Sequence, residues 1–161
     1  MMIKVNLTTN LIISTFSTPW GKLAVEFDEH FVYRSFFTQN SGPTISHPLS
    51  ILIQHELESY IANPNHRFQL QLKPQGSTYL QKVLNALLVI PIGRTITYGE
   101  LALTLQSSPR AVGQACKRNP LALFIPCHRV VGKHGLGGYM GSPDALHYKD
   151  ALLAHEMSVK R

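Results

Sequence analysis

The sequence is short of cysteine, of acidic side chains and of long apolar runs. Only two of its 161 residues are cysteines, Cys116 and Cys127, too few for a disulfide framework or a four-cysteine zinc site. No apolar stretch approaches the roughly 20 residues that cross a bilayer. The first residues also lack the layout of a signal peptide. We therefore expect a cytoplasmic protein without membrane association, in a compartment that keeps thiols reduced.

The eight histidines are too scattered to form an obvious metal site. Of these, only His147 and His155 share a predicted helix, and their spacing does not suit joint chelation of one ion. We therefore expect neither a metal ion nor another cofactor.

Acidic residues are few, and the imbalance lies in one half of the chain. Nine Asp and Glu face fifteen Lys and Arg, which gives a net charge of +6. Residues 1–75 hold five side chains of each sign, whereas residues 76–161 hold ten basic and four acidic ones. An excess confined to one half favours a polyanionic partner. A basic surface that serves only solubility remains the alternative.

The first half of the chain predicts a small α/β lobe with an antiparallel sheet. Alternating or β-branched runs over 11–16, 22–27 and 31–37 are separated by turn residues and indicate three strands in a meander. Apolar residues at helical spacing predict a helix over 49–62. The alternation over 68–72 predicts a last strand. No residue of this half carries evident chemistry.

The second half predicts a mostly helical lobe, after a linker over 73–77. Ser77 can cap its first helix, and Thr97 with Glu100 forms a capping box for a short one. Ser108 and Pro109 then begin another helix, which runs to about residue 117. These two short helices form a helix-turn-helix candidate.

Two further features follow in the C-terminal part. The glycine-rich stretch 132–138 comes after a predicted strand carrying Cys127 and is interpreted as a wing or a flexible loop. A final helix is predicted from the Ser142-Pro143-Asp144 cap, with Glu156 on its inward face. A buried carboxylate needs a partner, which is a structural salt bridge or the ring of His128.

The most reactive pattern is Ile125-Pro126-Cys127-His128-Arg129-Val130. A cysteine is a useful nucleophile where its surroundings favour the thiolate, and a histidine can accept its proton. Adjacent side chains rarely point at each other, so this transfer would need a bridging water. The alternative is an inert buried cysteine.

This six-residue run resembles the active-site signature of the O6-alkylguanine-DNA alkyltransferases. Three other stretches resemble the family in the same order, namely 90–102, 110–115 and 152–156. The resemblance covers residues from about 76 to 157. It implies an α+β fold with a small N-terminal α/β lobe, residues 1–75, and a mostly helical lobe with a winged helix-turn-helix, residues 76–161.

The resemblance also implies a function. Such proteins bind double-stranded DNA through the minor groove, rotate the damaged base out and move the alkyl group of O6-alkylguanine irreversibly to their own cysteine, here Cys127. We expect a monomer. Activity on O4-alkylthymine and cooperative binding to DNA both stay open. The implied residues are Cys127, His128, Glu156, Tyr98 and Asn119 for catalysis; Arg110, Ala111, Gln114, Tyr98 and Arg129 for DNA; and Val130, Tyr139, Met140 and Lys149 for the substrate.

Several alternatives remain at this level. Arg110 either fills the gap left by the extruded base or makes a plain phosphate contact. The protein as a whole could be a DNA-binding module of the same fold that flags lesions without transfer, although Cys127 argues against this. A thiol hydrolase unrelated to DNA is a third hypothesis, which the basic helix-turn-helix disfavours. The run Met140-Gly141-Ser142-Pro143 departs from the family pattern.

Overall fold

The N-terminal part is built on a three-stranded antiparallel meander, as predicted. The computed structural model describes residues 11–158, so the residues behind the signal-peptide expectation lie outside it. The strands are β1 (Ile12–Thr18), β2 (Gly21–Phe27) and β3 (Val32–Thr38), in the order β1-β2-β3. At the first turn Thr18 caps the backbone N–H of Gly21 with its hydroxyl.

Helix α1 (Pro48–Ala62) packs against this sheet and confirms the predicted helix. His47 caps it through Nδ1, and the buried face carries Ile53, Leu57 and Tyr60. Burial of such an apolar stripe is the main stabilising term for a helix of this kind.

The predicted strand over 68–72 is wrong. It reduces to one parallel bridge, between Leu72 and Val32, and the preceding residues follow an irregular path. The reason is tertiary: the ring of Phe68 packs edge-on against Phe124, 5.0 Å away, so this stretch connects the two halves. The alternation in the sequence therefore corresponds to alternate burial, while pairing with β3 is confined to Leu72.

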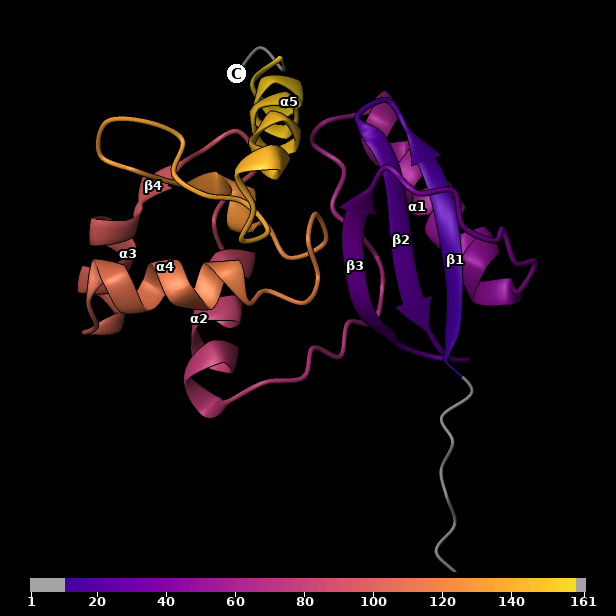
Figure 1. Cartoon of the computed structure of the whole chain (residues 1–161), viewed down its shortest axis with the longest axis horizontal. Helices are drawn as coiled ribbons and strands as arrows, with labels where there is room; N and C mark the ends of the chain where they lie inside the picture. Colours follow the sequence, from indigo (N-terminus) through magenta and orange to yellow (C-terminus); the bar gives the residue numbers. More distant parts are fainter. Residues whose placement is uncertain (1–10, 159–161) are drawn as a thin grey trace, which may run out of the picture.

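The C-terminal part is mostly helical, as predicted, and is joined to the sheet side by the coil around residue 75. Figure 1 shows the sheet with α1 at one side of the molecule and α2, α3 and α4 at the other. None of the helices within residues 11–158 is long and apolar enough to cross a membrane. The elements are α2 (Thr78–Leu88), β4 (Ile96–Thr97), α3 (Tyr98–Leu105), α4 (Pro109–Lys117), η1 (Cys127–Arg129), β5 (Val130–Val131), η2 (Pro143–Ala145) and α5 (Leu146–Met157).

The helix-turn-helix forms where its capping residues predict it. Thr97 and Glu100 make the reciprocal capping box of α3, and Ser108 caps α4 ahead of Pro109. Between the two helices Gln106 adopts a left-handed conformation, with φ of 53°, which ends α3 and turns the chain.

Two local expectations in this part are corrected. Cys127 does not lie on a strand but begins η1, a single 3₁₀ turn, and the strand β5 starts three residues later, pairing in parallel with β4. The final helix begins at Leu146, because the predicted start at Ser142 caps the separate turn η2. The glycine-rich stretch 132–138 is an irregular loop.

The two halves share one hydrophobic core and a hydrogen-bonded seam. Ser35 of β3 forms a parallel bridge with Leu121, and its buried hydroxyl donates to the carbonyl oxygen of Ala122 at 2.7 Å. Core residues from both halves pack in a single cluster, and Phe37 stacks on Tyr148 at 4.6 Å. A division into domains at residues 75 and 76 stays a prediction; below, N-terminal lobe and C-terminal lobe name the described residues on either side of it.

This seam gives a stability prediction. Replacing Ser35 with Ala leaves the buried carbonyl of Ala122 without the hydroxyl donor, so we expect a loss of about 1–2 kcal/mol in the free energy of unfolding. Urea denaturation measures it. Ser17→Ala, at an exposed position of β1, is the control and should change stability by less than about 0.5 kcal/mol. Equal effects of both variants would show that the seam contributes nothing specific.

Candidate active site

The position of Cys127 is set by a short loop that Asn119 holds together. Asn119 Nδ2 donates to the carbonyl oxygen of Ile125 at 2.9 Å, while its Oδ1 accepts from the backbone N–H of Leu121 at 3.0 Å. Pro126 then leads into η1, whose first residue is Cys127. One amide therefore fixes both ends of the turn that delivers the thiol.

Cys127 lines a cavity of about 350 Å³ between the helix-turn-helix and the loop that follows Gly137. The thiol is nearly buried, with 5% of the residue exposed. The second cysteine, Cys116, opens into the same cavity from α4. The lining residues are Tyr98, Pro109, Arg110, Gly113, Cys116, Lys117, Cys127, Gly138, Tyr139 and Met140.

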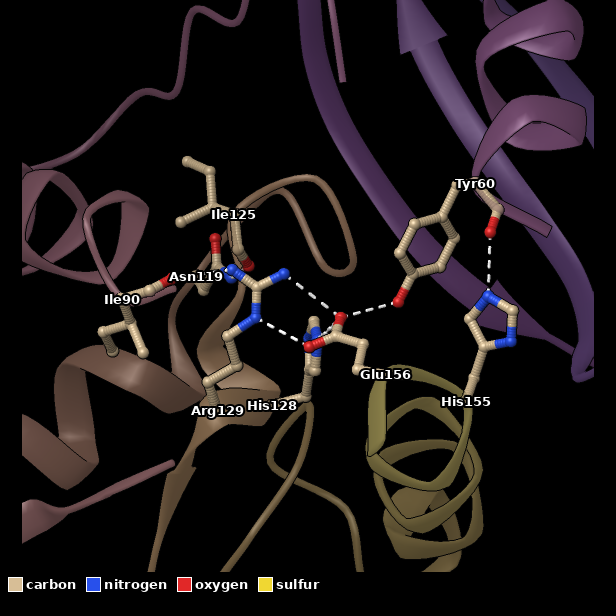
Figure 2. Close-up of polar contacts among 8 residues, drawn as sticks. All are labelled: Tyr60, Ile90, Asn119, Ile125, His128, Arg129, His155 and Glu156. Atoms are coloured by element: carbon tan, nitrogen blue, oxygen red, sulfur yellow. Dashed lines mark hydrogen bonds and ion pairs between the residues drawn. The ribbon is translucent and has the colours of Figure 1, made fainter. Parts of the chain in front are cut away.

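Glu156 of α5 forms the polar centre beneath η1. Its Oε2 lies 2.7 Å from Nε2 of His128, and Arg129 donates from Nε to Oε1 at 2.8 Å and from Nη2 to Oε2 at 3.1 Å. Figure 2 shows these side chains converging on the carboxylate. Burial raises the pKa of Glu156, but the hydrogen bonds and charges of His128 and Arg129 outweigh it and hold the pKa below its usual range. Glu156 is therefore an anion.

The tautomer of His128 follows from this contact. A carboxylate only accepts hydrogen bonds, so Nε2 carries the proton and Nδ1 keeps its lone pair. Burial lowers the pKa of His128, which keeps the ring neutral, although Glu156 acts in the opposite direction. Nδ1 is buried and meets no hydrogen-bonding protein atom within residues 11–158. His128 is thus a neutral base with its acceptor nitrogen unused.

The thiol of Cys127 is protonated at rest. Burial raises its pKa, and the hydrogen bond from Asn119 and the charge of Lys149 only partly oppose this. Burial likewise raises the pKa of Cys116 to about 12. The nucleophile therefore needs a base to form its thiolate.

Comparison with known proteins agrees with this geometry. A family model described as the DNA-binding domain of 6-O-methylguanine DNA methyltransferase matches residues 78–158. A methylated-DNA--protein-cysteine methyltransferase of Archaeoglobus fulgidus is 38% identical over 126 residues, which cover 77% of this chain and 84% of the relative. The chain belongs to the O6-methylguanine-DNA methyltransferase family.

Other relatives extend the match to both lobes. The constitutive methylated-DNA--protein-cysteine methyltransferase of Bacillus subtilis is 37% identical over 142 residues, 80% of this chain and 86% of the relative. The crystal structure of the Mycobacterium tuberculosis O6-methylguanine methyltransferase aligns with a TM-score of 0.81 at 31% identity, over 94% of this chain and 95% of that one. The α+β fold expected from the sequence is confirmed.

The helix α4 of this family member presents the predicted DNA-contacting side chains. Arg110 and Gln114 are exposed, Ala111 is half-buried, and Arg110 also borders the cavity. Tyr98, at the start of α3, lines the same cavity, and burial raises the pKa of its phenol to about 12. Tyr98 is therefore a permanent hydrogen-bond donor at neutral pH.

Two predicted assignments need correction. Arg129 was expected to contact DNA, but its guanidinium is buried and donates to Glu156 and, from Nη1, to the carbonyl oxygen of Ile90 at 2.9 Å. Lys149 was expected to contact the substrate, but it is fully buried and donates from Nζ to the carbonyl oxygens of Val130 at 2.6 Å and Gly138 at 3.0 Å. Both long cations brace the site from inside.

The three remaining predicted substrate contacts do not all line the cavity. Tyr139 and Met140 line the cavity, whereas Val130 is fully buried and does not. A backbone contact of Val130 with a guanine edge stays a prediction. Burial lowers the pKa of Lys149 to about 8, so its charge beside the two thiols depends on pH.

One residue of the site, Tyr60, was not predicted from the sequence. Its hydroxyl donates to Oε2 of Glu156 at 2.6 Å across the boundary between the lobes. The sequence indicates only that Tyr60 lies on the apolar stripe of the 49–62 helix, which predicts that its ring is buried but not that its hydroxyl has a polar partner.

The backbone of Gly137 lies close against the ring of Tyr98. Gly137 has φ of +75°, and a Cβ added there would stand 2.7 Å from both Oη and Cε2 of Tyr98. We expect Gly137→Ala to lose about 1–3 kcal/mol of stability and to displace the Tyr98 ring, because the backbone strain and the clash add. Urea denaturation and a crystal structure of the variant measure the two effects.

The neighbouring glycine is a matched control. A Cβ on Gly138 meets no atom within 4 Å, so Gly138→Ala should leave both stability and the Tyr98 ring nearly unchanged. If Gly137→Ala behaved like this control, the close approach of Gly137 would not determine the position of Tyr98.

Proposed function

We propose that this protein repairs alkylated DNA by moving the alkyl group from O6 of guanine to Sγ of Cys127, once per molecule. The observation that carries the proposal is a thiol in a cavity beside a helix-turn-helix, next to a neutral histidine with a free acceptor nitrogen. The names of the relatives, methylated-DNA--protein-cysteine methyltransferases, describe transfer of a methyl group from methylated DNA to a cysteine of a protein.

The residues supply the proton transfers that the displacement needs. A water between Cys127 and Nδ1 of His128 carries the thiol proton to the ring, and Glu156 stabilises the imidazolium that forms. The thiolate attacks the alkyl carbon, so the S–C bond forms as the bond from carbon to O6 breaks. Tyr98 donates a proton to the departing guanine.

The product explains why each molecule acts once. The methyl group replaces the thiol hydrogen, and guanine keeps the proton from Tyr98. The thiol proton held on His128 passes through solvent to the phenolate of Tyr98, so both side chains return to their resting forms and the atoms and charges balance without a cofactor. A thioether is a poor leaving group, and nothing in the reaction restores the thiol. The protein is therefore consumed, like a reagent.

The DNA is bound through α4. Its exposed face lies in the minor groove, the damaged base rotates into the cavity, and Arg110 fills the gap that it leaves. The support is that Arg110, on this helix, is exposed and also lines the cavity wall. A relative of known structure, that of Mycobacterium tuberculosis, has been crystallised in complex with DNA; it aligns with a TM-score of 0.79 at 32% identity, over 91% of this chain and 92% of that one.

The basic excess of the second half suits a phosphate backbone, so binding should weaken with salt. We further propose that the protein acts as a monomer in the cytoplasm, where thiols stay reduced.

The transfer predicts a modified cysteine. After incubation with a duplex that contains one O6-methylguanine, peptide mass spectrometry should find one methyl group on Cys127, in equal amount to the repaired base. Cys127→Ser should show none. Cys116→Ser is the matched control, because this thiol lines the same cavity but belongs to α4 and not to η1, which carries His128, and the variant should react like the unmodified protein.

Other outcomes would lead elsewhere. Tight binding of the lesion with Cys127 unmodified would indicate a module that flags damage without repairing it. Repeated turnover on a small ester would indicate a thiol hydrolase. Either result would remove the proposed transfer.

The assistance by His128 and Glu156 predicts a pH dependence. Because burial raises the pKa of Cys127, the thiolate fraction and the transfer rate should rise with pH from neutral into the alkaline range. Glu156→Gln should slow transfer about 100-fold at neutral pH. The deficit should shrink at high pH, where hydroxide removes the proton without His128. Single-turnover rates across this range measure it, and a deficit that stays constant with pH would contradict base assistance.

A further inference from the structure

The carboxylate of Glu156 is held from both lobes. Tyr60, near the C-terminal end of α1, donates from Oη to Oε2 of Glu156 at 2.6 Å, the oxygen that also faces Nε2 of His128. In Figure 2 the phenol reaches the carboxylate from the sheet side, opposite Arg129. The ring of Tyr60 is completely buried.

The hydroxyl acts as a fixed donor. Burial raises the pKa of Tyr60 far above neutrality, and the charge of Glu156 raises it further, so the phenol keeps its proton. Its ring is wedged between Trp20, Phe68 and His155, with centroids 5.0 to 5.6 Å away. Because the ring is packed in place and the phenol keeps its proton, the hydrogen bond from Tyr60 sets the position of Oε2 of Glu156.

The other donors to Glu156 do not provide such an independent point. His128 and Arg129 are consecutive residues of η1, so their contacts move together whenever this turn shifts. Tyr60 belongs to another element in the other lobe. Tyr60 therefore holds Oε2 from α1, independently of the position of η1.

We propose that Tyr60 is a positioning residue for alkyl transfer, which acts by holding Oε2 of Glu156 in line with the ring of His128. This role rests on the proposed function. Without the phenol, Oε2 keeps only its contacts with η1, from Nε2 of His128 and Nη2 of Arg129, so its angle to the imidazole ring is less constrained. The imidazolium is then less stabilised, and less thiolate forms at Cys127. The N-terminal lobe thereby contributes directly to the chemistry.

The test is Tyr60→Phe in the full-length protein. The variant keeps the ring and its aromatic contacts, so thermal unfolding should show a folded protein. Single-turnover transfer from a duplex with O6-methylguanine should be about tenfold slower at neutral pH, the order of loss expected for a hydrogen bond to a charged group. The rate should approach that of the unmodified protein at alkaline pH.

A second readout does not depend on DNA. The pH dependence of Cys127 alkylation by iodoacetamide reports the apparent pKa of the thiol. We use the Cys116→Ser background so that one thiol reacts. Tyr60→Phe should shift this profile to higher pH. In a Glu156→Gln background the same substitution should have little further effect, because Tyr60 acts through Glu156.

Ser35→Ala is the matched control for the contact between the lobes. The hydroxyl of Ser35 donates to the carbonyl oxygen of Ala122 at 2.7 Å, a contact between the lobes that involves neither Tyr60 nor Glu156. The control should leave the alkylation profile unchanged. A parallel slowing in both variants with unchanged profiles would reduce Tyr60 to a structural contact and overturn the proposal.

The unmodified protein distinguishes failure of the proposed function from failure of the role of Tyr60. If Cys127 of the unmodified protein is not methylated, the proposed function fails. If it reacts and Tyr60→Phe matches it at every pH, only the role of Tyr60 fails. Additive effects of Tyr60→Phe and Glu156→Gln would also reject that role, because they would place the two residues on separate paths.

Discussion

The structure depends on one buried anion, the carboxylate of Glu156. An ionised carboxylate is stable away from water only when hydrogen bonds and opposite charge replace its hydration. Among the described residues it receives four hydrogen bonds, from Tyr60, His128 and twice from Arg129. These donors lie on α1 and η1, so satisfying one side chain of α5 fixes three elements against each other. The reactive turn is therefore held both by the local loop around Asn119 and by this carboxylate from a distant helix.

This constraint also explains which parts could be predicted from sequence. The caps of α3 and α4 are set by residues within a few positions of each other, Thr97 with Glu100 and Ser108 with Pro109, so they were found. The three-stranded meander was found for the same reason, because turn residues separate its runs. Local patterns predicted local structure.

Apart from the two local corrections at Cys127 and Ser142, the failures involve contacts between distant residues. The 68–72 stretch alternates as a strand would, but Phe68 packs on Phe124 rather than forming a ladder. Arg129 was predicted to contact DNA because of its positive charge, since the sequence does not show that it pairs with Glu156, 27 positions away. In the same way Tyr60 looked like core, since its hydroxyl meets Glu156 across 96 positions. In the site, the sequence indicated the residue types that belong to the chemistry, while the fold decided which of them face the cavity.

Burial of the nucleophile has a physical consequence for a protein that is used once. A thiol with a raised pKa reacts slowly with stray electrophiles and oxidants, since the thiolate is the reactive form. The same burial lowers the pKa of His128 and leaves Nδ1 with its lone pair, ready to accept a proton. The low dielectric around Cys127 and His128 disfavours both the thiolate and the imidazolium, so both side chains are neutral before the substrate binds. In such surroundings the ion pair can form only where a fixed anion stabilises the imidazolium. The precision with which Glu156 is held therefore matters more here than it would in a solvated site.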